Sequence, residues 1–195
     1  MSATVTEIAN DVFRINVMPA GGRLSFSCFL VRDEWPAMIE TGFDRLYGMY
    51  DAVYEAISGL IDPVSLSYVF VPHFEPDECG ALNRFLALAP QAEAVCSPIG
   101  ATVTLPDFAI RPPRALEHEE SLSLGRKTLR AVVAPWVHVW DSMLVYDETD
   151  RVLFTSDLFG QGGDRPPVEV EDLSSIIVEE SRNSGVFPSQ KHLER

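Results

Sequence analysis

The sequence has 195 residues, 46% of them hydrophobic, which is enough to bury a core, and we expect residues 1–195 to form a single domain. Asp and Glu number 29 against 15 Lys and Arg, and the net charge of −14 argues against nucleic-acid partners, because it repels a phosphate backbone. No apolar run has membrane-spanning length, the N-terminus has no signal-peptide pattern, and three cysteines do not make a disulfide framework. We therefore expect a cytoplasmic protein that does not bind membranes.

The first sixty residues predict two β-hairpins and a helix. Residues 5–8 pair with 12–17, where apolar and polar side chains alternate cleanly. Residues 26–31 pair with 37–39 around a polar turn. In residues 43–60 apolar side chains recur at three-and-four spacing, which predicts one long amphipathic helix.

A strand buried on both faces is predicted at residues 66–71, where the apolar run is almost unbroken. Pro72 cannot extend a β-ladder, so the strand is expected to end there. Residues 78–88 then predict a second helix, ended by Pro90, with Asp77 as its N-cap.

The rest of the chain is predicted to be mostly β-structure. The expected elements are a strand at 92–96, a brief helix at 98–103, a proline-broken loop at 106–114, and two hairpins, 122–125 with 128–133 and 143–146 with 152–155. Two more helices are predicted in the tail, at 168–178 and from Pro188 onward. This order of elements favours an α/β sandwich with helices outside two sheets.

Side chains of the kind that bind metals follow the buried strand directly: His73, Glu75, Asp77 and Glu78. Positions two apart in an extended loop point the same way, so His73 and the first two carboxylates can converge. The alternative is an ordinary polar connection that happens to contain a histidine. His118, in a polar run, is expected to be solvent-exposed.

His138 and Asp157 also follow predicted strands. Ligands on separate strand ends can surround one site at the edge of a sheet. An aspartate has two carboxylate oxygens, so Asp157 could bridge two metal ions.

These residues carry a family resemblance. His73, Glu75 and Asp77 form an H-x-E-x-D pattern that resembles the first metal motif of flavodiiron proteins, a redox branch of the metallo-β-lactamase fold. Eighteen residues separate His138 from Asp157, as in the family pattern. The neighbouring segments H-V-W-D-S and S-D-L-F-G resemble the family's H-W-P-D-S and S-D-A-F-G. The resemblance covers about residues 10–163 and implies a four-layer αββα sandwich.

The resemblance also implies a role for each ligand. His73, Glu75 and His138 would hold one iron, Asp77 would hold a second, and Asp157 would bridge the two. Hydrolytic relatives carry a second imidazole where this chain has Glu75, and the carboxylate hardens the site towards iron or manganese rather than zinc.

Two departures from the family pattern concern the second iron. Glu78 stands where the family has a histidine, and it is either a ligand or an acid favoured at the start of a helix. The family's last histidine would fall beyond Arg195, and His192, the remaining candidate, is more readily explained as an exposed helical residue. We therefore expect a chain truncated before its last strand and ligand; a natural stop after Arg195 would contradict this.

The expected function is binding of O2 or NO at a diiron centre. Because we find no FMN site in these 195 residues, reductase activity would need electrons from a separate flavoprotein. Whether the protein is an enzyme or a sensor stays open. The alternatives are a dinuclear metallohydrolase and a degenerate scaffold that binds no metal. Family members often pair head to tail, which leaves a homodimer open.

Overall fold

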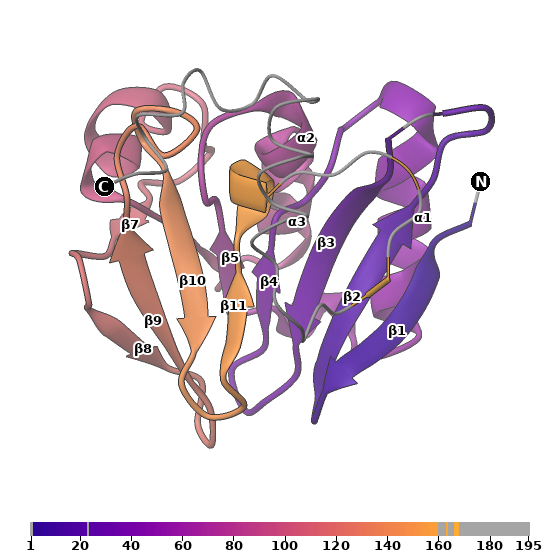
Figure 1. Ribbon diagram of the computed structural model, residues 1–195, viewed down its shortest axis with the longest axis horizontal. Helices are drawn as coiled ribbons and strands as arrows, with labels where there is room; N and C mark the ends of the chain where they lie inside the picture. Colours follow the sequence, from indigo (N-terminus) through magenta and orange to yellow (C-terminus); the bar gives the residue numbers. More distant parts are fainter. Residues whose placement is uncertain (1, 23, 160–162, 164–165, 168–195) are drawn as a thin grey trace.

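The structure is a computed structural model that describes residues 2–22, 24–159, 163 and 166–167. Two β-sheets lie face to face (Figure 1). The larger sheet has its seven strands in chain order: β1 Thr4–Ala9, β2 Val12–Val17, β3 Phe26–Val31, β4 Ala37–Ile39, β5 Tyr68–Phe70, β6 Glu93–Cys96 and β7 Arg114–Ala115. The smaller is antiparallel in the order β11, β10, β9, β8: Val152–Phe154, Met143–Asp147, Thr128–Val133 and Ser121–Ser123.

The strand directions explain why one edge of the larger sheet can carry a site. β1 to β4 are antiparallel neighbours, whereas β4, β5, β6 and β7 are parallel. The chain therefore leaves β4 and β5 at the same edge, and ligands that follow strands in this way can meet.

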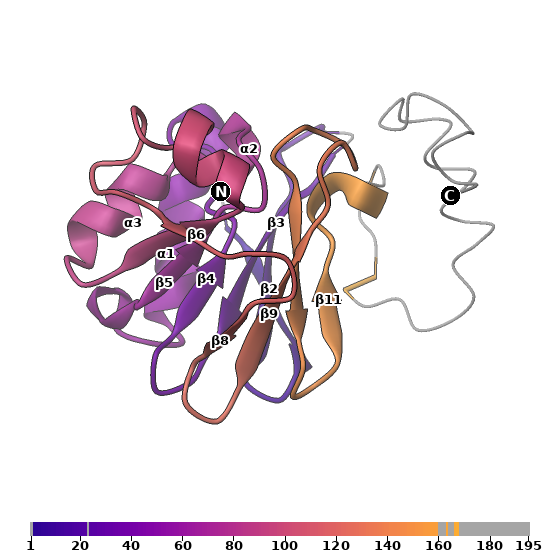
Figure 2. The same ribbon diagram turned by 90° about the vertical axis from the view of Figure 1, so that its left-hand side faces the viewer.

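Helices cover the outer face of the larger sheet (Figure 2). They are α1 Met49–Ser58, α2 Pro76–Cys79 and α3 Leu82–Leu88. One apolar cluster lies between helices and sheet, with Val53, Phe85 and Val69 among its members. A second lies between the sheets and includes Phe70 and Val145. β5 is thus buried on both faces, as predicted.

The layers confirm the expected α/β class with two sheets. None of the helices in the described residues has the length and apolar character needed to cross a membrane. The three cysteines are free and buried, and His118 is exposed, as expected. The helices predicted at 168–178 and from Pro188, together with His192, lie outside the described residues.

The long helix predicted at 43–60 is wrong in its first part. A 3-10 helix, Leu46–Gly48, precedes α1, and Tyr47 and Gly48 both have left-handed backbone angles, with φ of 58° and 59°. Phe43 and Tyr47 pack against Phe26 of β3 instead, with ring centroids 5.2 and 6.2 Å away. Their spacing fits a helix, but the backbone conformation here follows from the aromatic cluster around Phe26 and from the left-handed Gly48, so α1 begins only at Met49.

The helix predicted at 78–88 is two helices, and Asp77 is not an N-cap. Pro76 opens α2, so Asp77 lies inside its first turn and Glu75 occupies the capping position without a side-chain cap bond. At Gly80 the chain passes so close to its neighbour that an added Cβ would lie 3.1 Å from the Gly42 carbonyl oxygen. The close contact requires glycine at this position, and beyond it the Ala81 N–H donates to the Gly42 carbonyl oxygen at 2.9 Å instead of continuing α2.

Two shorter predictions also shift. The brief helix expected at 98–103 ends as a π-helix, Gly100–Thr104. The loop expected at 106–114 gives way to β7 at its last residue, Arg114.

The turn between β3 and β4 fastens the larger sheet to the smaller one. The Asp33 carboxylate, 0% exposed, accepts hydrogen bonds from the backbone N–H of Lys127 at 2.7 Å and from Arg126 Nε at 2.9 Å. Lys127 is itself buried and pairs with Asp150 in the turn between β10 and β11. Burial raises the pKa of Asp33, but these hydrogen bonds outweigh it, so its pKa lies below the ordinary value.

We expect Asp33→Asn to weaken the protein most above pH 4. Because the folded pKa of Asp33 is depressed, its contribution to stability is complete above the unfolded pKa of about 3.9, and is lost as pH falls through the folded pKa. The difference in free energy of unfolding between wild type and variant, from urea titrations, should therefore shrink from pH 6 to pH 2. Asp107→Asn, at an exposed carboxylate, is the control. A difference that does not change with pH would contradict this account.

Candidate metal centre

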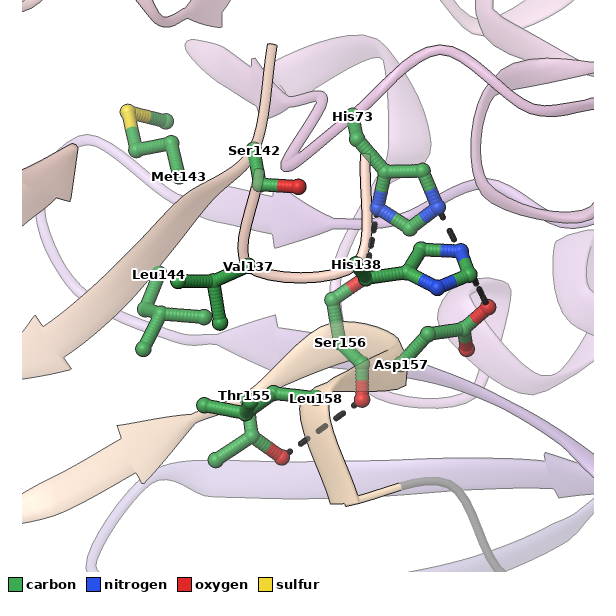
Figure 3. Close-up of a pocket in the computed structure, with 10 residues that line it drawn as sticks. All are labelled: His73, Val137, His138, Ser142, Met143, Leu144, Thr155, Ser156, Asp157 and Leu158. Carbon is green, nitrogen blue, oxygen red and sulfur yellow. Dashed lines mark hydrogen bonds and ion pairs between the residues drawn. The ribbon is translucent and has the colours of Figure 1, made fainter. Parts of the chain in front are cut away.

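Four segments bring the predicted ligands together at one edge of the sandwich. His73 and Glu75 follow β5, Asp77 and Glu78 lie on α2, His138 lies in the loop between β9 and β10, and Asp157 lies in the 3-10 helix Ser156–Phe159 after β11. Figure 3 shows the two imidazole rings side by side, with the Asp157 carboxylate pointing towards them. All six predicted metal residues thus reach one region, from both sheets.

The first ligand group contains His73, Glu75, His138 and Asp157, whose ligand atoms all lie within 4.8 Å of one another. Glu75 Oε2 is 3.0 Å from His73 Nε2 and 2.9 Å from His138 Nε2. Asp157 Oδ2 is 3.9 and 3.5 Å from the same two nitrogens. Ligand atoms that each bind one ion at about 2.1 Å lie roughly 3 to 4 Å apart, so the spacing fits a single metal ion.

The second group contains Asp77, Glu78 and Asp157, again within 4.8 Å. Asp157 belongs to both groups, as a bridging ligand would. Glu78 is 3% exposed, and its Oε2 has no hydrogen-bond partner among the described residues. A buried carboxylate oxygen is rarely left without a partner, and a cation would satisfy it.

The carboxylates in the site would be stabilised in their charged form by bound cations. Burial, and next the charge of Glu40, raises the pKa of Glu78 to about 11. Burial also raises the pKa of Asp157. For Glu75 burial acts in the same direction, but hydrogen bonds from His138 and His73 outweigh it and lower the pKa. Among the described residues, the ion pairs of these acids are with the two histidines alone. A cation beside Glu78 would favour its charged form, and two divalent ions would offset the crowding of these carboxylates.

Glu40 also lies in the site, although it was not among the ligands predicted from the sequence. It follows β4, has a left-handed backbone with φ of 63°, and is 9% exposed. Burial raises its pKa to about 8; a hydrogen bond with Ser156 lowers it, and the charges of Asp157 and Asp77 raise it. The signal was present, since Glu-Thr-Gly follows a buried strand just as His73 does.

Thr41, next to Glu40, holds the second ligand segment in place. Its backbone N–H donates to the Glu78 carbonyl oxygen at 2.6 Å, and its hydroxyl donates to the same oxygen at 3.1 Å. The end of β4 therefore positions α2.

Ser156 fixes the orientation of His73. Its Oγ lies 3.2 Å from His73 Nδ1, which leaves Nε2 facing Glu75 and Asp157. A metal at Nε2 requires the proton to sit on Nδ1, and the serine hydroxyl can accept from that N–H or donate to a bare nitrogen. Ser156 also has a left-handed φ of 49°, and in this backbone conformation its hydroxyl faces His73.

The loop of His138 is tied to the first ligand loop. Trp136 and His138 both have left-handed backbones, with φ of 67° and 80°. The Ser142 hydroxyl closes the loop through the backbone of Val139. The Met143 N–H donates to the carbonyl oxygen of Pro72, directly before His73, at 2.8 Å. This bond joins the loop that carries His138 to the loop that carries His73, and so fixes the position of one loop relative to the other.

Comparison with known families decides the wider relationship. A family model described as ODP family beta lactamase matches residues 26–183. The chain belongs to this family. The resemblance to the flavodiiron branch of the metallo-β-lactamase fold is confirmed by relatives and solved structures.

The relatives of this ODP family member are considerably longer proteins. The Flavo-diiron protein FprA2 of Clostridium acetobutylicum is 28% identical over 169 residues, which is 79% of this chain and 41% of the relative. The Putative diflavin flavoprotein A 2 of Synechocystis is 36% identical over 140 residues, 70% of this chain and 23% of the relative. The chain thus spans less than half of either.

Among solved structures, the rubredoxin oxygen:oxidoreductase of Desulfovibrio gigas superposes with a TM-score of 0.79 at 23% identity, covering 92% of this chain and 49% of that one. The flavodiiron protein of Giardia intestinalis gives 0.76 at 21% identity, covering 100% and 52%. These likenesses establish the fold.

We expect Ser156→Ala to weaken metal binding about tenfold, because partners of metal-bound histidines commonly contribute that much. The measurement is a competition titration of metal-depleted protein with Fe²⁺ and a chelator, without oxygen. Nitrogen NMR shifts of His73 should show a changed tautomer balance, which mere loss of stability would not produce. Ser58→Ala, at the exposed end of α1, is the control. Unchanged affinity together with an unchanged tautomer would sink the assignment.

Proposed function

We propose that this chain holds two iron ions and binds O2 or NO at them. It would act as a sensor, or as the metal component of an O2 or NO reductase that takes electrons from a separate flavoprotein. The observation that carries the proposal is the sharing of Asp157 by two ligand groups. One has two imidazoles, and the other includes the Glu78 oxygen that accepts no hydrogen bond from the part of the chain that the structure describes.

In this proposal, different residues would bind each of the two iron ions. His73, Glu75 and His138 would hold the first ion, Asp77 and Glu78 the second, and Asp157 both. Iron, when bound, supplies the redox chemistry that O2 and NO require. The carboxylate of Glu75 favours iron or manganese over zinc.

The site is open enough for small molecules to reach it. The Glu75 side chain is 40% exposed and that of Asp157 is 37% exposed, whereas His73 is 2% exposed. The buried histidine keeps the geometry rigid, and the exposed carboxylates mark the side from which a diatomic ligand could enter.

The names of the relatives support the same function. One is called a flavo-diiron protein, and one solved structure is called a rubredoxin oxygen:oxidoreductase. Because this chain matches only part of each, we assign the flavin to a group outside these 195 residues. Free, buried thiols at Cys28, Cys79 and Cys96 support a reducing compartment, and we propose the cytoplasm. A homodimer stays a prediction.

The direct test is metal content and optical spectrum of protein purified without oxygen and then exposed to air. We expect about two irons per chain and a near-ultraviolet band that appears with oxygen, because both ligand groups are complete enough to bind. Asp157→Ala should lose both ions, since it removes the shared ligand, and His118→Gln, at an exposed histidine, should lose neither.

Other outcomes would change the function. Zinc at both positions would favour a metallohydrolase, which activates a water molecule rather than a diatomic gas. Absence of bound metal after anaerobic reconstitution would favour the degenerate scaffold.

A further inference from the structure

The two ligand groups that share Asp157 differ in their donor atoms. The first contains two imidazole nitrogens, from His73 and His138, beside carboxylate oxygens. The second, Asp77, Glu78 and Asp157, offers oxygen alone. His73 Nε2 lies 3.6 Å from Glu78 Oε2 but is directed at Glu75, 3.0 Å away. Both histidines therefore serve one half of the centre.

Glu78 is what makes the second half an all-oxygen site. Its side chain is 5% exposed, its Oε2 has no hydrogen-bond partner among the described residues, and its backbone is held by Thr41. Glu78 is thus a buried carboxylate with a fixed backbone, and one of its oxygens lies 3.6 Å from His73 Nε2 without a hydrogen bond among the described residues. An acid retained only for its helical propensity would instead face solvent.

Donor type decides which divalent ions a site prefers. Imidazole suits iron, zinc and other later transition metals, whereas carboxylates suit manganese and magnesium. Iron(II) binds more tightly than manganese(II) to most ligand sets, and nitrogen donors widen the gap. When both ions are supplied in limited amounts, the most stable arrangement places iron among the nitrogens and leaves the oxygen site to manganese.

We propose that the centre sorts metals when iron is limiting: the half formed by His73, Glu75 and His138 then takes iron, and the half formed by Asp77 and Glu78 takes manganese, with Asp157 shared between them. This inference rests on the proposed dinuclear function and specifies the chemistry of its two positions. The same four carboxylates face either pair of divalent ions, so the mixed pair is as well balanced in charge as two irons.

The test uses the full chain, stripped of metal with a chelator and kept without oxygen. One equivalent of Fe²⁺ and one of Mn²⁺ are added together, unbound metal is removed, and X-ray absorption is recorded at both metal edges. We expect one iron and one manganese per chain, with imidazole scattering at the iron edge and none at the manganese edge. Imidazole scattering of equal strength at both edges would overturn the sorting.

A substitution at Glu78 tests the cause. Glu78→His adds a nitrogen donor to the second half, and the ratio of manganese to iron retained from an equimolar mixture should fall about tenfold, the scale of a changed metal environment. Glu55→His introduces the same residue on the exposed face of α1 and should leave the ratio unchanged. Thermal unfolding of the metal-free proteins establishes that both variants are folded. A ratio unaffected by Glu78→His in a folded protein would contradict the proposal.

Failure of this inference is distinguishable from failure of the proposed function. If the wild-type chain binds neither ion, the dinuclear function itself is wrong. If it takes two irons and rejects manganese even when iron is limiting, the centre stands and only the sorting is wrong.

Discussion

The crowding of several carboxylates at one edge of the sandwich is the constraint that the surrounding backbone has to satisfy. Glu40 and Glu78 are buried beside the partly exposed Asp157 at the edge of the sandwich, and burying even one unpaired charge costs several kcal/mol. Side chains that repel one another would move apart unless the backbone prevented it. Here the backbone does, through the two hydrogen bonds from Thr41 to Glu78 and the close approach of Gly80 to Gly42. The apolar packing beneath β4 and β5 makes those backbone positions rigid.

The need to hold six side chains also accounts for the unusual backbone around the site. Glu40, His138 and Ser156 all have positive φ without being glycine, a conformation that costs free energy for most residues. Each stands directly beside a strand end or in a tight loop that ends at one. Local strain thus occurs where the backbone directs a candidate ligand, or a neighbour of one, into the site.

The sequence allowed the fold and the convergence of the six candidate ligands to be predicted, but not all of the geometry. Alternation in an extended loop correctly placed His73 and Glu75 together, whereas Asp77 joins the other ligand group because Pro76 begins a helix and ends the alternation. The helix at 43–60 was overextended, because periodicity does not distinguish a helical stripe from aromatics that cluster around Phe26. Glu40 was overlooked although it follows a buried strand as His73 does, because its proximity to Ser156 and Glu78 depends on how the two sheets assemble.

The hydrogen bond between Asp33 and Lys127 affects how the two sheets can move relative to each other. It joins the two sheets at the turns between strands, whereas the ligands meet at the opposite ends of those strands. Hydrogen bonds therefore join the two sheets at one end of the strands, and the proposed metal ions would join them at the other end. If the proposed ions bind there, amide protons at the ligand ends of β4, β5 and β11 would exchange with solvent faster once the metal is removed. Those near Asp33 and Lys127 would stay protected, so loss of metal would loosen the sandwich from one end without unfolding it.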